Sequence, residues 1–162
     1  MMKVLGIDPG SLHTGYGVIE KDGQKLNLIE SGCIDNSAKD NYTERYNHIY
    51  TGLTKIIQKT QPDVVALENV IYCNNSRVAI KLGEARGVAI LAAAQSGVPI
   101  AEYAPKRIKQ AAVGNGNASK VQVQNMIRHL LQMNELPPPD TADALAAAIC
   151  HINDFLKHLV HN

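Results

Sequence analysis

The chain has 162 residues, of which 45% are hydrophobic and 19% are charged, and its formal net charge is +1. This length and balance exclude a disordered chain and favour a single domain over residues 1–162 with one hydrophobic core. The opening residues predict no secretory signal, and no run approaches the ~20 apolar residues of a membrane helix. The three cysteines (Cys33, Cys73 and Cys150) show no paired metal spacing and are typical of reduced thiols, so we expect a cytoplasmic protein.

The first 68 residues predict four strands and one helix. Apolar runs broken by turn residues indicate the strands, and apolar residues at helical spacing indicate the helix. The predicted elements are strands at 3–8, 13–20, 25–34 and 62–68 and a helix at 42–60. Lys21-Asp22-Gly23 has the composition of a hairpin turn between the second and third strands.

The rest of the chain predicts mostly helices. The predicted elements are helices at 75–96, at 105–113, from Ser119 to about Met133 and from Asp140 to about Leu159, and a strand at 98–103. Ser119 is a suitable N-cap, and the glycine- and asparagine-rich residues 114–117 before it predict a flexible loop. Hairpin strands followed by β-α-β crossovers predict an α/β fold with a five-stranded mixed sheet and helices on both faces.

A basic stretch lies in the second half of the chain, although the net charge is small. Between Arg77 and Arg128 the sequence has eight basic and two acidic residues, an excess of six. The eight are Arg77, Lys81, Arg86, Lys106, Arg107, Lys109, Lys120 and Arg128. Such an excess suits a face that binds DNA phosphates, but it equally suits a solvated helical surface, so the pattern alone leaves both open.

Four acidic residues stand where predicted elements begin or end. Asp8 and Glu68 each end an apolar strand, the position at which α/β sheets bind their ligands. Asp140 and Asp143 are three residues apart at the start of the last predicted helix and therefore share one face. Taken alone, Asp8 is better explained as a turn residue, and helix capping is a sound explanation for Asp140 or Asp143. Two like charges on one face, however, repel each other unless a cation lies between them.

Carboxylates converging from two strand ends and one helix start predict a site for Mg²⁺ or Mn²⁺, since these cations prefer oxygen ligands. A pair of such ions, about 3.5–4 Å apart, supports hydrolysis of a phosphodiester. No histidine or cysteine cluster in the sequence indicates zinc.

Five segments carry a resemblance to a known family. They are GIDPGSLHTGYGVI at 6–19, PDVVALENV at 62–70, KLGEARGVAI at 81–90, YAPKRIKQAAVGNG at 103–116 and DTADALAAAICH at 140–151. Together they resemble the RuvC family of bacterial Holliday junction resolvases, which have a ribonuclease-H-like fold. Several long motifs in order are far more specific than one short pattern.

The resemblance implies a Mg²⁺-dependent endodeoxyribonuclease that resolves four-way DNA junctions by paired symmetric nicks in recombination and repair. It implies that Asp8, Glu68, Asp140 and Asp143 are the metal-binding catalytic acids, with two ions per site. Lys109 and Lys120 match functionally important lysines of the family, and we expect both to contact phosphate and Lys120 to stabilise charge in the transition state.

Further DNA contacts are expected before these lysines in the chain. Where the family usually has a base-stacking phenylalanine, this sequence has Ile71 followed by Tyr72. Either residue is a candidate wedge, and ordinary packing is the less favoured alternative. Arg77 and Lys81, in the basic stretch, are also expected to contact DNA.

The resemblance further implies a homodimer, because two symmetric cuts need two equivalent sites, and cooperation with a branch-migration motor complex. Gly83 and Gly87 provide small residues four apart in the predicted helix at 75–96, which permits close approach of a partner helix. The sequence alone does not exclude that these glycines pack against the sheet of their own protomer.

Three other functions fit parts of the sequence. The segment DPGSLHTGYG also resembles the phosphate loop of actin-like phosphotransferases, but those enzymes need two such domains around the nucleotide. A small ribonuclease-H-like family that processes ribosomal RNA precursors shares the N-terminal acid, but the KLGEARG segment and the paired aspartates favour the resolvase. A non-catalytic junction-binding protein is expected to lack at least one of the four acids, and all four are present.

Overall fold

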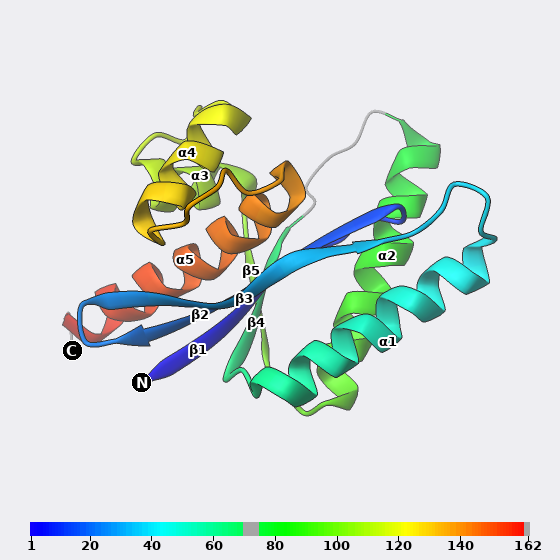
Figure 1. Ribbon diagram of the computed structural model, residues 1–162, viewed down its shortest axis with the longest axis horizontal. Helices are drawn as coiled ribbons and strands as arrows, with labels where there is room; N and C mark the ends of the chain where they lie inside the picture. Colours follow the sequence, from blue (N-terminus) through cyan, green and yellow to red (C-terminus); the bar gives the residue numbers. More distant parts are fainter. Residues whose placement is uncertain (70–74, 161–162) are drawn as a thin grey trace.

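The computed structural model describes residues 1–69 and 75–160, the last five of them for the backbone alone. Five strands form one sheet in the order β3-β2-β1-β4-β5 (Figure 1). The strands are β1 (Met2–Asp8), β2 (His13–Asp22), β3 (Lys25–Asp35), β4 (Val64–Glu68) and β5 (Ile100–Tyr103). The first three pair antiparallel, and β1, β4 and β5 pair parallel, so the mixed sheet expected from the sequence is present.

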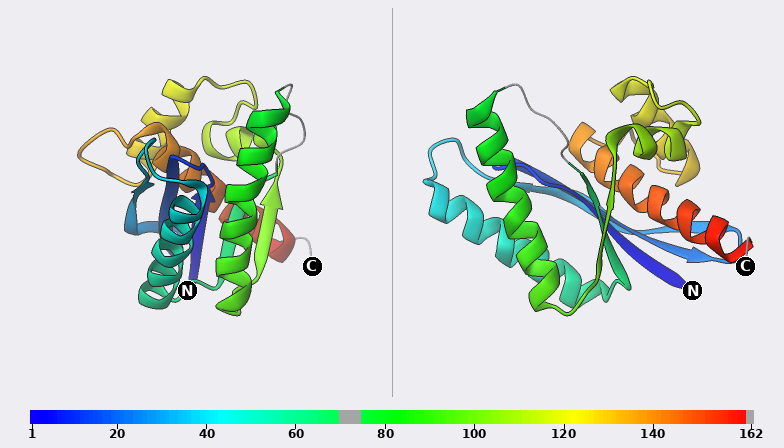
Figure 2. Two further views of the ribbon diagram at one scale, coloured as in Figure 1. Left: turned by 90° about the vertical axis from the view of Figure 1, so that its right-hand side faces the viewer. Right: turned by 180° about the vertical axis from the view of Figure 1, so that it is seen from behind.

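Five helices cover the sheet, two on one face and three on the other (Figure 2). They are α1 (Tyr42–Thr60), α2 (Ser76–Gln95), α3 (Pro105–Val113), α4 (Lys120–Leu130) and α5 (Pro139–Val160). Helices α1 and α2 pack on the face that presents Leu5, Ile7 and Leu67. Helix α5 packs on the opposite face, against Val4 and Ala66, with α3 and α4 outside it. Because successive side chains of a strand point to opposite faces, the apolar strands supply both cores at once.

Local sequence signals explain where the helices begin and end. Asn41 caps α1 and Ser119 caps α4, each in a capping box with the residue three positions on, which confirms the predicted role of Ser119. Helix α4 ends at Leu130 rather than at about Met133, because Leu131 is the C-cap and Gln132 has a φ of 51°. Residues 114–117, expected to be a flexible loop, form a compact turn in which the amide of Asn117 donates to the side chain of Asn115.

Glycines on β1 and β2 allow α5 to lie directly on the strands. A Cβ at Gly6 would be 1.8 Å from the carbonyl oxygen of Ala144, and a Cβ at Gly15 would be 2.1 Å from that of Asp140. Side chains at these positions would therefore push the helix away from the sheet. The close approach fixes the height of the first turn of α5 above the strand ends. Within residues 1–69 and 75–160, no helix is both long enough and apolar enough to cross a membrane.

Candidate active site

The ends of β1 and β4 bring two of the predicted acids together. Asp8 is the last residue of β1 and Glu68 the last of β4, and the parallel register pairs Ile7 with Leu67 immediately before them. Both acids therefore point to the α5 face, since paired residues of neighbouring strands share a face. Across β1, Asp8 pairs with Gly15 of β2, which has no side chain to fill the space beside it.

The first turn of α5 supplies the other two acids above this space. The backbone of Asp140 lies over Gly15, next to Asp8, as the close contact described above requires. Asp143 follows one turn along, half-buried like Asp8 and Glu68. The start of α5 thus lies over the carboxyl ends of β1 and β4, although these segments are far apart in the sequence (Figure 1).

The four carboxylates lie close enough for the charge of one to change the pKa of another. The pKa of Asp8 is raised from an ordinary 3.8 to about 7, first by burial and then by the negative charges of Asp143, Asp140 and Glu68. Burial also raises the pKa of Glu68 and of Asp143. Asp143 adds to the effect on Glu68, and Asp140 adds to the effect on Asp143. Bringing all four into the ionised state costs free energy that a bound cation would offset.

The four acids do not form one tight cluster of ligand oxygens. In the described part of the chain, no three of the four acids bring ligand oxygens within 4.8 Å of one another. A single Mg²⁺, with ligands at about 2.1 Å, needs a tighter cluster than this.

Two lysines lie within the field of the acids. Lys120 is the first residue of α4, and its Nζ lies 3.9 Å from Oδ2 of Asp143. Its charge lowers the pKa of Asp8, Glu68 and Asp143, and Lys109 of α3 acts in the same direction on Glu68 and Asp143. Both lysines therefore adjoin the candidate site, on the side formed by α3 and α4.

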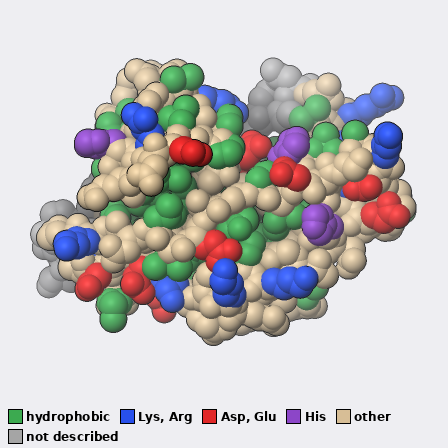
Figure 3. Space-filling view, in the orientation of Figure 1, with side chains coloured by type: hydrophobic (Ala, Val, Ile, Leu, Met, Phe, Trp, Pro, Cys, Tyr) green, Lys and Arg blue, Asp and Glu red, His purple; other side chains and the backbone are tan. Residues whose placement is uncertain are grey.

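The remaining predicted DNA contacts divide into two groups. Arg77 and Lys81 are exposed on the first turns of α2, on the other side of the acids from α3 and α4. Figure 3 shows Lys and Arg side chains in both places, over α3 and α4 and over the start of α2, with acidic side chains between them. Ile71 and Tyr72 lie outside the described residues.

The basic stretch is weaker than its excess of six charges suggests. Arg86 forms an ion pair of 2.7 Å with Glu102, and Arg107 one of 2.7 Å with Asp154. The guanidinium of Arg86 also approaches the carbonyl oxygen of Glu68 at 3.5 Å. These two arginines therefore contribute to the fold, and their charges are partly compensated by Glu102 and Asp154.

One group of potential ligands was missed from the sequence, which showed no histidine or cysteine cluster. His13, Cys33 and Asp35 have ligand atoms that all lie within 4.8 Å of one another. The pairing of β2 with β3 sets His13 opposite Asp35 and Gly15 opposite Cys33. The signal that could have found the group is the hairpin register, since their spacing along the chain resembles no metal motif.

Comparison with known families identifies the family of the chain. The family model for crossover junction endodeoxyribonuclease RuvC matches residues 4–151, nearly the whole chain. The chain belongs to the RuvC family.

Individual RuvC proteins agree with this membership. The chain is 52% identical over 153 residues to crossover junction endodeoxyribonuclease RuvC of Vibrio parahaemolyticus, covering 94% of this chain and 88% of that protein. It is 49% identical over 152 residues to the RuvC of Geotalea uraniireducens, covering 94% and 89%. The resemblance drawn from the five segments is therefore confirmed.

Solved structures of RuvC confirm the ribonuclease-H-like fold. The structure of T. thermophilus RuvC in complex with Holliday junction substrate superposes with a TM-score of 0.91 at 34% identity, covering 98% of this chain and 97% of that one. The yeast mitochondrial Holliday junction resolvase Ydc2 has a TM-score of 0.65 at 16% identity and shows the fold alone.

Proposed function

We propose that Asp8, Glu68, Asp140 and Asp143 form the active site with which this chain, as a crossover junction endodeoxyribonuclease, cuts four-way DNA junctions. The observation that carries the proposal is the convergence of the acids from the ends of β1 and β4 and the start of α5. Burial and the three other acids raise the pKa of Asp8 to about 7, which agrees with this placement. Carboxylates placed for capping alone would not converge in one field from β1, β4 and α5.

The donor set fits Mg²⁺, with Mn²⁺ as a substitute, and two ions per site. Bound there, the ions supply an activated water and neutralise the charge that develops on the leaving oxygen. The four acids hold and space the ions, and the glycines of β1 and β2 let α5 bring Asp140 down beside Asp8. No sulfur or nitrogen ligand is needed, which favours hard cations.

Lys120 and Lys109 support the phosphate side of the reaction. Lys120 is 71% exposed, so its ammonium can turn from Asp143 to a DNA phosphate without leaving a buried charge unpaired. Near the scissile phosphate it would stabilise the extra negative charge of the transition state. Lys109, half-buried on α3, is the more fixed of the two and is suited to positioning the backbone. We keep Arg77 and Lys81 as DNA contacts and Ile71 or Tyr72 as the base wedge.

A homodimer through α2 fits the two symmetric cuts. Gly83 and Gly87 are exposed, and a Cβ at either would meet nothing within 4 Å, so they do not pack against the sheet of their own protomer. Ile80 and Leu91 are 60% and 48% exposed and follow the same helical stripe. Small residues flanked by exposed aliphatic ones suit a second helix, and the two-fold partner is the occupant we propose. The branch-migration motor complex remains an expected partner, with no surface assigned to it.

The function is tested with a synthetic mobile four-way junction, Mg²⁺ and the Asp8→Asn variant. We expect the wild-type protein to make paired symmetric nicks, and Asp8→Asn to bind the junction without cutting it. Asp22→Asn, which changes an exposed acid at the far end of β2, is the matched control and should cut normally. Cutting by Asp8→Asn at the wild-type rate would overturn the proposal, as would cleavage of structured RNA in place of the four-way DNA.

A further inference from the structure

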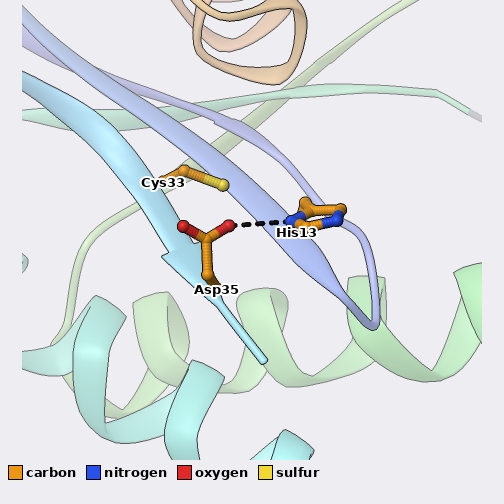
Figure 4. A group of neighbouring side chains, drawn as sticks. All are labelled: His13, Cys33 and Asp35. Carbon is orange, nitrogen blue, oxygen red and sulfur yellow. Dashed lines mark hydrogen bonds and ion pairs between the residues drawn. The ribbon is translucent and has the colours of Figure 1, made fainter. Parts of the chain in front are cut away.

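His13, Cys33 and Asp35 lie together at the ends of two paired strands (Figure 4). His13 opens β2, and Cys33 and Asp35 stand two residues apart at the end of β3, so all three point to the same face of the sheet. One nitrogen, one sulfur and one oxygen of the group all lie within 4.8 Å of one another. All three residues lie on strands, so neither helix capping nor pairing of charges on a helix surface accounts for the group.

We propose that His13, Cys33 and Asp35 form a zinc site, separate from the four carboxylates and unlike them in chemistry. Thiolate and imidazole select Zn²⁺ over Mg²⁺, whereas carboxylates without sulfur select Mg²⁺ or Mn²⁺. Three protein ligands leave one position of a tetrahedral ion open to water, the arrangement of an accessible site rather than of a closed structural one.

The side chains need a small rearrangement to hold the ion. Nδ1 of His13 lies 2.8 Å from Oδ1 of Asp35, a hydrogen bond that metal binding would replace. Ligand atoms on a tetrahedral zinc ion are about 3.4 Å apart, so the pair must open by roughly half an ångström. His13 and Asp35 are 57% and 65% exposed, so both can rotate without disturbing the core.

The surroundings of Cys33 favour a cation. Its sulfur lies within 4.8 Å of a carboxylate oxygen of Asp35. Burial, and after it the charges of Asp35, Asp140 and Asp8, raise the pKa of the Cys33 thiol to about 12. Zinc binding replaces the thiol proton, which leaves to solvent as the sulfur–zinc bond forms. The carboxylate of Asp35, which opposes an isolated thiolate, stabilises the dication that displaces this proton.

The site adjoins the proposed active site but shares none of its ligands. Gly15 separates Cys33 from Asp8 in the row of paired residues, and the backbone of Asp140 covers Gly15. An ion at Cys33 would thus lie on the far side of this glycine from the catalytic acids. The zinc site does not depend on the nuclease function, and its test has to separate the two.

The test uses Co²⁺ as a spectroscopic probe of the full chain, with Mg²⁺ in excess and a phosphine reductant. We expect a sulfur-to-cobalt charge-transfer band in the near ultraviolet that saturates at one ion per chain and disappears when Zn²⁺ is added. Cys33→Ser should abolish the band. His13→Gln and Asp35→Asn, both at exposed positions, should weaken metal binding by at least about tenfold while the circular dichroism spectrum is unchanged.

Two matched variants make the result specific. Cys73→Ser should keep the band, which assigns it to the Cys33 thiol. Asp8→Asn should also keep it, although it abolishes cutting, so that failure of the zinc site and failure of the proposed nuclease site are distinguishable. A wild-type protein without the band, or a band that survives in Cys33→Ser, would overturn the zinc site.

Discussion

Nζ of Lys120 lies 3.9 Å from Oδ2 of Asp143, which joins the first residue of α4 to the first turns of α5. The lysine side chain is 71% exposed, yet its charge lowers the pKa of Asp8 and Glu68 as well as that of Asp143. One exposed ammonium therefore acts on three acids that come from three different elements. This position gives α4 a function in the site that its packing alone would not indicate.

Lys120→Ala should lower the single-turnover rate of junction cutting by about 100-fold, because loss of one preformed electrostatic contact to a transition state has roughly that effect. Junction affinity should change much less, since the remaining phosphate contacts stay in place. Lys120→Arg keeps the charge and is the matched control, with an expected rate between the two. Equal rates for wild type and Lys120→Ala would show that the lysine does not act on the reaction.

Gly15→Ala should destabilise the fold and abolish cutting together. The added Cβ would lie 2.1 Å from the carbonyl oxygen of Asp140, so the first turn of α5 must move away from β2. We expect the free energy of unfolding to fall by about 1–3 kcal/mol, the typical range for overpacked sites. Chemical denaturation measures the loss, and the cutting assay measures whether Asp140 is displaced.

Gly83→Ala, in contrast to Gly15→Ala, should stabilise the protomer. A Cβ at this exposed helical position meets nothing within 4 Å, and alanine has the higher helix propensity. The free energy of unfolding of the protomer should rise by up to about 1 kcal/mol. A Gly83→Ala protomer less stable than the wild-type protomer would contradict the open surroundings of this glycine.

Most of the fold follows from local patterns in the sequence. All ten elements were predicted in order, because their apolar spacing and turn residues agree with the tertiary structure. The position of Asp8 and Glu68 at neighbouring strand ends also follows, since parallel strands align their carboxyl ends. Their convergence with α5 rests on tertiary packing at Gly6 and Gly15, which no local pattern reveals.

The cluster at the end of the β2–β3 hairpin was missed because a bulge decides it. The register changes from Ile19 opposite Leu28 to Val18 opposite Glu30, so Ile29 is an extra residue on β3. Without the bulge, His13 would pair with Ile34 rather than with Asp35, and the candidate ligands would point to opposite faces. A single inserted residue in a long hairpin cannot be placed from composition.

The stability of the metal-free protein should depend on pH through Asp8. Its pKa is about 7 in the folded protein and ordinarily 3.8, so the folded protein keeps a proton between these values that the unfolded chain releases. The free energy of unfolding therefore falls as pH rises from about 4 to about 7, and it levels off above. The Asp8→Asn side chain cannot ionise, so the free energy of unfolding of this variant lacks the dependence on pH that Asp8 causes. In chelator, the stability of Asp8→Asn relative to wild type should therefore grow by about 2–4 kcal/mol between about pH 4 and pH 7.

Addition of Mg²⁺ should reverse this order above pH 7. The cation stabilises the ionised wild-type quartet, while Asp8→Asn has one ligand fewer to offer. Urea denaturation at several pH values, with and without Mg²⁺, gives both comparisons, and Asp22→Asn should follow the wild type throughout. Parallel curves for wild type and Asp8→Asn in chelator would mean that the acids do not share a field.

The dimer is tested at Gly87, where a large side chain harms the interface without touching the protomer. A Cβ there meets nothing within 4 Å, so Gly87→Lys should fold normally, but it places bulk and charge on the stripe proposed to receive the partner helix. We expect sedimentation to give a dimer for wild type and a monomer for Gly87→Lys at the same concentration. Gln58→Lys, on an exposed position of α1, adds the same charge elsewhere and should remain a dimer. Because its catalytic acids are intact, the Gly87→Lys monomer should still cut one strand of a junction, but it should lose the paired symmetric cuts. Paired cutting by a protein that stays monomeric on the junction would contradict the symmetric model.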